Sequence, residues 1–168
     1  MRLTHILLFV PLLLCGCARD KEALNILGNM TYYVSQPLFT DKAELINGKH
    51  HEEFLSAWLE NQYVYGDFNH DGLKDAAVIL VENYGGNADS YILAFLINDG
   101  KRLMHKSSIF LETWAIINSV KERSGEVLVD MYVHQEGDCN AGPSKRVREV
   151  YKYEGSEDVP FTVREREG

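Results

Sequence analysis

Cysteine is scarce in this chain, and its placement gives no disulfide framework. The sequence has three cysteines among 168 residues: Cys15 and Cys17 lie close together near the start, and Cys139 stands alone. Small exported domains that depend on disulfides carry several cysteines that can pair within the chain. We therefore expect stability to come from a hydrophobic core, for which a chain of this length is large enough.

Basic residues are also in short supply. Seventeen Lys and Arg residues face 25 Asp and Glu residues, so that the formal net charge at pH 7 is −8. Nucleic acids and anionic lipid surfaces attract proteins with an excess of positive charge. The charge balance therefore argues against both as partners, and any membrane attachment is expected to depend on a lipid rather than on a basic patch.

The apolar run near the start of the chain is too short to cross a membrane. Ile6 to Leu14 spans about nine residues, whereas a membrane-spanning helix needs about 20. The run follows Met1-Arg2, and a positive charge followed by a short apolar core is the pattern of a signal peptide. We expect this leader segment to be removed from the mature protein.

The residues after this run resemble the lipobox of bacterial lipoproteins. Leu14-Cys15-Gly16-Cys17 carries the likeness, which implies cleavage after Gly16, lipidation of Cys17 with three acyl chains and attachment to a membrane of the cell envelope. Several acyl chains make such attachment stable. Ala18 follows the cysteine, which in a Gram-negative cell implies the outer membrane, facing the periplasm. The alternative is an ordinary secretory signal with an incidental cysteine.

Removal of residues 1–16 leaves one domain by length. The mature chain would have 16 basic and 25 acidic residues, since Arg2 is lost, and a net charge of 16 − 25 = −9. We expect residues 17–29 to be the lipidated cysteine and a tether, because Arg19 to Glu22 is charged and little of the segment is apolar. Residues 30–168 are expected to form a single β-rich domain.

Short segments rich in β-branched and aromatic residues indicate a mainly antiparallel β fold. The pattern predicts a small sheet or sandwich-like domain with one short helix at most, and an α+β fold stays open. The expected strands are 31–34, 63–66, 76–83, 90–98, 108–111, 116–121, 126–134, 146–153 and 159–164. Because residues 76–81 and 91–97 are almost continuously apolar, those two strands are expected to be central and covered on both faces.

One segment, His51 to Glu60, looks helical. Phe54, Leu55, Trp58 and Leu59 form a stripe at helical spacing, although an edge strand fits almost as well. The basic run Lys145-Arg146-Val147-Arg148 alternates as an exposed strand does, and we expect its charges to offset neighbouring carboxylates.

The loop Asp67 to Asp75 is the most informative motif of the sequence. Asp67, Asn69, Asp71 and Asp75 place oxygens at loop positions 1, 3, 5 and 9 around Gly72, and the Leu73 carbonyl stands at position 7. Ca²⁺ is a hard cation that takes several oxygen ligands from such a loop. Position 12 is Val78 rather than glutamate, so an EF-hand is excluded. The alternative to a metal site is a polar hairpin turn.

This loop is similar to the calcium loops of integrin-type β-propeller repeats, which implies calcium bound by a hairpin. The motif occurs once, which argues against a whole propeller. With the following Gly85-Gly86 and Tyr91 to Ala94, the segment Tyr65 to Leu80 also resembles a group of largely uncharacterised exported bacterial domains. In that group two adjacent cysteines precede a proline, whereas this chain has Cys139 alone. The resemblance implies an extracytoplasmic β-rich domain and no particular activity.

Other candidate sites are weaker. His134, Asp138 and Cys139 could serve zinc or a cysteine nucleophile, but no second pair of ligands accompanies them. The sequence has no nucleotide-binding loop, no nucleophile elbow and no H-E-x-x-H motif. The expected function is a non-enzymatic envelope lipoprotein with a structural calcium loop and a protein or cell-wall partner. The alternative is a small hydrolase or processing factor that uses the metal or Cys139.

Overall fold

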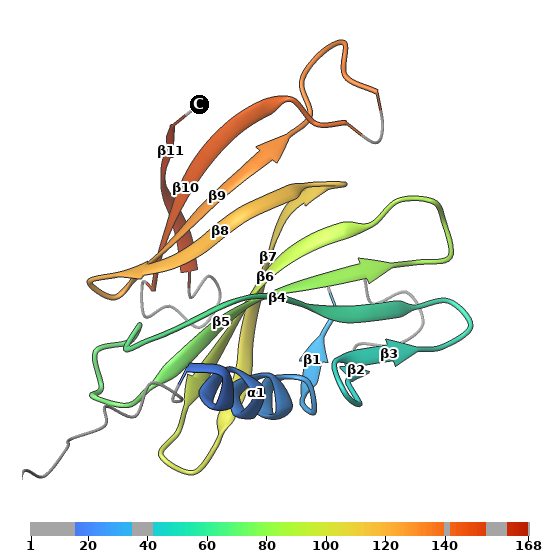
Figure 1. The fold of residues 1–168 in the computed structure, drawn as a ribbon. Coiled ribbons are helices and arrows are strands. Elements are labelled where there is room, and N and C mark those ends of the chain that lie inside the picture. The colour runs from blue at the N-terminus through green and yellow to red at the C-terminus, as the bar shows by residue number, and fades with distance from the viewer. Residues whose placement is uncertain (1–15, 35–41, 140–141, 154–160, 168) are drawn as a thin grey trace, which may run out of the picture.

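The structure is a computed structural model that describes residues 16–34, 42–139, 142–153 and 161–167. It contains two large antiparallel sheets, a two-stranded sheet and one helix (Figure 1). The elements are α1 (Gly16–Leu27), β1 (Thr31–Tyr33), β2 (Lys42–Glu44), β3 (Lys49–His51), β4 (Ser56–Gly66), β5 (Asp75–Asn83), β6 (Ser90–Asn98), β7 (Leu103–Thr113), β8 (Ile116–Arg123), β9 (Glu126–Val133), β10 (Lys145–Tyr153) and β11 (Phe161–Glu167).

Both large sheets are meanders, because the strands in each follow one another along the chain. One has the order β3-β4-β5-β6-β7, the other β11-β10-β9-β8, and β1 pairs with β2. The expectation of a mainly antiparallel β domain is therefore confirmed. Every expected strand overlaps a strand of the structure, although Val159 and Pro160 of the last one lie outside the described residues. The short strands β2 and β3 were not expected.

The two large sheets face each other across one hydrophobic core. The inner residues of β9 alternate along the strand with half-buried ones, as a strand with one face on a core requires. This first core contains Phe68, Ala77, Ile79, Leu93, Phe95, Ile97, Leu111, Val127, Val129, Met131, Val133, Val147 and Tyr151. The arrangement is sandwich-like, with the turn of the chain from one sheet to the other at Trp114 and Ala115 between β7 and β8.

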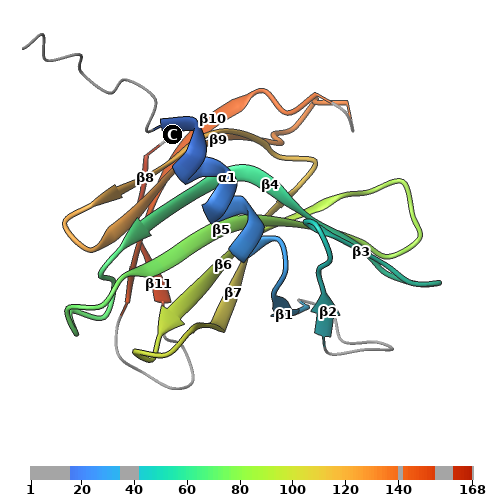
Figure 2. The same cartoon turned by 60° about the horizontal axis from the view of Figure 1, so that its bottom comes forward.

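A second core lies on the opposite face of the five-stranded sheet. There α1 and the β1–β2 pair lie against the sheet (Figure 2). The core contains Leu27, Tyr32, Val34, Ala43, Leu45, Leu55, Ala57, Ala76, Val78, Leu80, Ile92, Ala94 and Leu96. Because the sheet has a core on each side, β5 and β6 are covered on both faces, and the sequence expectation for these two strands is confirmed.

Of the two structures left open for His51 to Glu60, the helix is wrong. A strand is found instead, but it is not at the edge of the sheet, because β4 lies between β3 and β5. The segment instead ends β3, turns, and forms the first half of β4, where Trp58 pairs with Val81 and Leu59 with Leu80 of β5. Phe54, part of the expected apolar stripe, is exposed. The side chains that reach the second core are Leu55, Ala57 and Leu59, which recur every second residue. That period belongs to a strand, and pairing with a buried strand outweighs a weak helical pattern.

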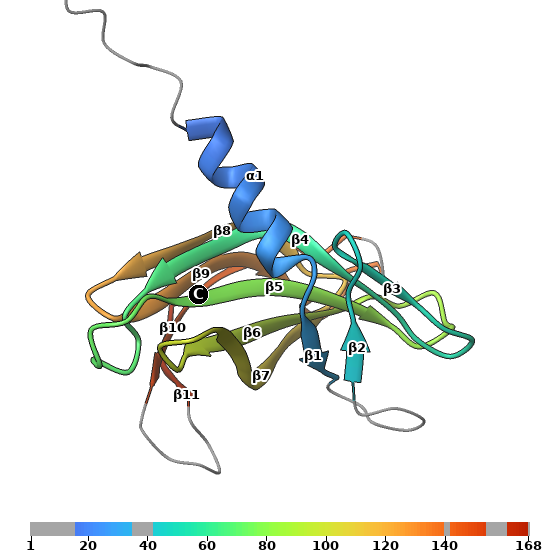
Figure 3. The ribbon, with the colours of Figure 1, turned by 90° about the horizontal axis from the view of Figure 1, so that it is seen from below.

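The helix of the structure lies in the segment that was expected to be a tether. Ala23 and Leu27 are buried, and the hydroxyl of Tyr32 donates a hydrogen bond of 2.8 Å to the carbonyl of Leu27. Packed structure therefore begins before Met30. The first turns of α1 project beyond the strands (Figure 3), so the helix leads from the expected lipid site toward the sheet.

Candidate functional site

The loop Asp67 to Lys74 connects β4 to β5 at one end of the sandwich. Figure 1 shows it at the same end as the β6–β7 and β8–β9 turns. Phe68 anchors it: its side chain is buried in the first core, with its ring edge-on to Phe95 at a centroid distance of 6.0 Å. The polar residues on either side of Phe68 are therefore held at the surface by an apolar contact below them.

Three of the predicted ligand side chains fold inward over the loop backbone. Asp67 accepts hydrogen bonds from the backbone N–H groups of Asp71 and Gly72, both at 3.0 Å. Asn69 Oδ1 accepts from the same Asp71 N–H at 3.1 Å, and its amide donates to Asp71 Oδ2 at 2.7 Å. Asp71 Oδ1 accepts from the N–H of Leu73 at 2.7 Å. The oxygens of Asp67, Asn69 and Asp71 are thus gathered around one short stretch of backbone.

Asp75, the fourth predicted ligand, is placed differently. It is fully buried, and its two oxygens accept hydrogen bonds of 2.9 Å from the N–H groups of Phe68 and Asn98. Burial raises the pKa of Asp75, and these backbone hydrogen bonds act in the opposite direction. The carboxylate therefore ties the start of the loop to the end of β6, a structural task that needs no metal.

The residues of the loop fit a calcium ion in part. Asp67, Asn69 and Asp71 supply oxygens of the kind that Ca²⁺ prefers, and each carboxylate oxygen can accept a bond beyond the one it already has. In the part of the chain that the structure describes, no three His, Cys, Asp or Glu side chains come close enough together to hold a metal ion. A calcium site here would therefore depend on the Asn69 amide and the Leu73 carbonyl as well as on the carboxylates.

The turns of two neighbouring hairpins lie against the loop. A side chain on Gly125, in the β8–β9 turn, would place its Cβ 2.7 Å from His70 Cε1 and 3.3 Å from the Asp67 carbonyl oxygen. A Cβ on Gly100, in the β6–β7 turn, would lie 3.8 Å from Leu73 Cδ1, which is an ordinary van der Waals contact. The loop therefore touches both large sheets, and its conformation depends on how the sheets are stacked.

The structure says nothing of the lipidation site itself. The side chain of Cys17 and residues 1–15 lie outside what is described. Among the described residues, no helix has the length and apolar character needed to cross a membrane. Lipidation at Cys17 stays a prediction from the sequence.

The weaker candidate around Cys139 is a polar loop after β9. Cys139 is free and exposed, and His134 Nε2 lies 3.2 Å from the Cys139 carbonyl oxygen. Asp138 is held by Ser144, whose hydroxyl and N–H both donate to it, and these bonds lower the pKa of that carboxyl. Of the three candidate residues His134, Asp138 and Cys139, Asp138 therefore uses its carboxylate to close the loop.

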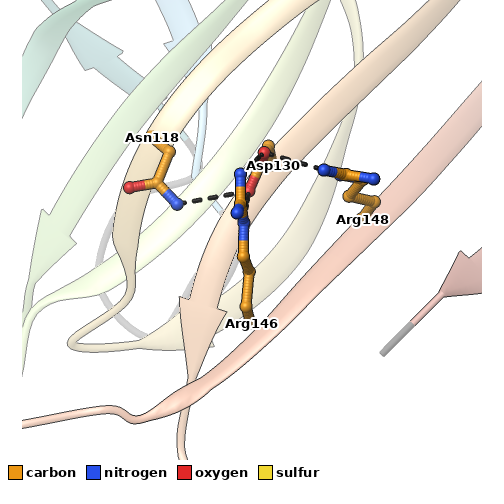
Figure 4. Close-up of polar contacts among 4 residues, drawn as sticks. All are labelled: Asn118, Asp130, Arg146 and Arg148. Atoms are coloured by element: carbon orange, nitrogen blue, oxygen red, sulfur yellow. Dashed lines mark hydrogen bonds and ion pairs between the residues drawn. The ribbon is translucent and has the colours of Figure 1, made fainter.

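The clearest charged cluster lies on the outer face of the four-stranded sheet. Arg146 binds Asp130 with two hydrogen bonds, 2.9 Å from Nε and 2.6 Å from Nη2 (Figure 4). Arg148 Nε lies 3.6 Å from the same carboxylate and Asn118 donates to it at 3.2 Å. Arg146 holds the pKa of Asp130 well below its usual range. The expectation that the basic run offsets neighbouring carboxylates is confirmed, but only the register of β9 and β10 identifies Asp130 as the partner.

Comparison of the chain with models of protein families, with curated proteins and with solved structures finds no match. Function must therefore be argued from the residues themselves.

Proposed function

We propose that the protein is a lipoprotein of the bacterial cell envelope, anchored through acyl chains on Cys17, with a domain that acts by binding rather than by catalysis. The observation that carries this proposal is Leu14-Cys15-Gly16-Cys17, placed directly after a short apolar run. The compact β domain and the helix that leads into it from Gly16 are compatible with a globular unit presented at a membrane surface. Its partner is an envelope protein or the cell wall, and no nucleic acid is expected.

The loop between β4 and β5 is proposed to bind Ca²⁺ in a structural role. Support comes from the inward-folded oxygens of Asp67, Asn69 and Asp71, with the Leu73 carbonyl and Asp75 as the remaining proposed ligands. A cation between these acidic side chains removes their mutual repulsion. Because the loop touches the turns of both sheets, the ion would stabilise the stacking of the sandwich.

The lipid anchor is tested by labelling cells with radioactive palmitate. Label is expected in the wild-type protein and in a Cys15→Ser variant, since residue 15 leaves with the signal peptide, and not in Cys17→Ser. The Cys15→Ser variant is the matched control, because it changes a cysteine two positions away. Equal labelling of Cys17→Ser and wild type would disprove the anchor.

A further inference from the structure

A groove of about 990 Å³ lies between α1, the β1–β2 pair and the start of β7. Its walls come from three segments: the end of α1 to the end of β1, the strand β2, and residues 101–106, which are far from the other two in the sequence. Tyr33 and His105 join two of these walls, because the Tyr33 N–H donates a hydrogen bond of 2.7 Å to His105 Nδ1 and the two rings stack. The volume is at the upper end of the range for small-molecule sites.

Positive charge is concentrated around this groove, although the protein as a whole is acidic. Its lining includes four cations, Lys42, Lys101, Arg102 and Lys106, against one carboxylate, Glu44. Lys101, Arg102 and Lys106 are exposed and form no ion pair among the described residues. The nearby Asp99 carboxylate is turned into the β6–β7 turn, where it accepts the N–H groups of Lys101 and Arg102.

Apolar side chains share the groove with these cations. Ile26 and Tyr33 are about half exposed, at 47% and 49%, and Met30, Leu103 and Met104 are partly buried beside them. The alternation along β1 and β2 explains the arrangement: Tyr32 and Ala43 face the second core, so Tyr33 and Lys42 face the groove, with the ammonium 5.5 Å from the ring centre. A surface with both cations and apolar groups matches a ligand that is anionic at one end and apolar at the other.

We propose that this groove binds an anionic phospholipid, with Lys101, Arg102 and Lys106 around the phosphate and Ile26, Met30 and Met104 against the first acyl carbons. The choice of a lipid rests on the proposed anchor. Ile26 is nine residues after Cys17, and a helix rises about 1.5 Å per residue, so the groove begins about 14 Å along α1 from the acylated position. The net negative charge of the protein opposes general adhesion to an anionic membrane, whereas a local cluster of cations holds a single headgroup.

The methionines of the chain allow a direct test. Apart from Met1 of the signal peptide they are Met30 and Met104, which line the groove, and Met131, which is fully buried between the two sheets. The acylated full chain, with ¹³C in its methionine methyl groups, is placed in nanodiscs of phosphatidylcholine alone or mixed with phosphatidylglycerol. With phosphatidylglycerol, the NMR signals of Met30 and Met104 are expected to shift, the Met131 signal to stay, and high salt to reverse the shift.

Two variants separate the groove from general surface charge. Lys101→Gln combined with Lys106→Gln is expected to raise the phosphatidylglycerol fraction needed for half the shift about fivefold, as loss of two exposed charge contacts implies. Lys121→Gln is the matched control, since Lys121 is an exposed lysine on β8, away from the groove, and it should behave as wild type.

Three results would overturn the proposal. The first is that the Met30 and Met104 signals are identical in the two kinds of disc. The second is that the double variant responds to phosphatidylglycerol as wild type does. The third is that Lys121→Gln weakens the response as much as the double variant does. A chain that is not acylated would not be recovered with the discs at all, so failure of the anchor is distinguished from failure of the groove.

Discussion

The Asp75 carboxylate accepts the backbone N–H of Asn98 at 2.9 Å, across the start of β5 and the end of β6. Its other oxygen accepts the N–H of Phe68, the second residue of the acidic loop. One buried side chain therefore connects three parts of the five-stranded sheet, and Asp75 has a structural role whether or not a metal is present. We expect metal binding by the loop to depend mainly on Asp67, Asn69 and Asp71.

Calcium is expected to stabilise the protein modestly. Loops of extracellular modules bind Ca²⁺ with dissociation constants of about 10⁻⁴ to 10⁻³ M. At ten times that constant, mass action adds about 1.4 kcal/mol to the free energy of unfolding. In thermal unfolding this corresponds to a rise in Tm of roughly 3 to 6 °C for a domain of this size. Mg²⁺ should do less, because it gives up its water reluctantly.

Asp71→Ala should abolish this response, since it removes the carboxylate at the middle of the loop. Glu136→Ala is the matched control: Glu136 is an exposed carboxylate in a different loop, and its variant should respond to calcium as wild type does. Identical melting curves for wild type in calcium and in a chelator would mean that the loop is only a turn.

Acidification is expected to destabilise the contact between β1 and β7 through His105. Burial lowers the pKa of His105 to about 4, compared with about 6.5 in an unfolded chain. The unfolded state therefore binds the extra proton first, and stability from this group is complete above pH 6.5 and lost as the pH falls toward 4. The loss is at most about 3 kcal/mol. The main physical cause is that the buried imidazole lacks hydration when it becomes charged. In addition, a protonated Nδ1 can no longer accept the Tyr33 N–H.

Urea unfolding at a series of pH values measures this effect. His105→Asn keeps an acceptor for the Tyr33 N–H but does not titrate, so the difference in stability between wild type and variant should shrink or reverse on acidification. If the two proteins lose stability in parallel between pH 7 and 4, the acid sensitivity lies in other groups.

Gly125→Ala is expected to destabilise the protein by roughly 1 to 3 kcal/mol. Two effects add: the residue has φ of 80°, and the new Cβ would approach His70 Cε1 at 2.7 Å. Gly85→Ala is the matched control, because Gly85 has φ of 82° but nothing within 4 Å of an added Cβ. Its cost should therefore come from the backbone alone and be smaller.

A double-mutant cycle with His70→Ala isolates the contact between the loop and the β8–β9 turn. Removing the imidazole should relieve part of the cost of Gly125→Ala, by about 1 kcal/mol. Chemical denaturation of the four proteins gives the coupling. If the effects of the two substitutions on the free energy of unfolding simply add, His70 and the β8–β9 turn are not in contact.

Cys139→Ser should change the free energy of unfolding by less than about 1 kcal/mol. The residue is exposed and its thiol is free, in a loop closed by Asp138 and Ser144. Urea unfolding under reducing conditions measures the change, with Ser144→Ala as a comparison that removes a bond to Asp138 and should cost more. A larger loss for Cys139→Ser would show that the thiol is bonded or buried in solution.

Local sequence patterns were sufficient to predict the structure where a short stretch of residues determines its own environment. The continuous apolar runs of β5 and β6 predicted strands covered on both faces, because only a strand with a core on each side leaves no room for polar residues. The pair Asn47-Gly48, a strong signal for a tight turn, lies between β2 and β3 with φ of 53° and 81°. This pair is the local signal for a turn between these two short strands.

Tertiary structure was needed where one local pattern permits two structures. Leu55, Ala57 and Leu59 reach the core at a period of two, while Phe54 and Trp58 complete a helical stripe that proves irrelevant. Pairing with β5 decided between the two, since a long buried strand offers more contacts than a short amphipathic helix could make. Tertiary structure also decided that α1 is a packed helix. Its sequence is only weakly amphipathic, but its last turn buries Leu27.

By itself the sequence determined the β class, the central strands, the composition of the acidic loop and the expected lipid site at Cys17, because each depends on neighbouring residues. Only the tertiary structure decided that Asp75 is buried, that Arg146 pairs with Asp130, and that cations from β2, the β6–β7 turn and β7 surround one groove. Those relationships join residues distant in the chain. They are determined by strand register and by the stacking of the layers. Neither of these produces a recognisable pattern among neighbouring residues of the sequence.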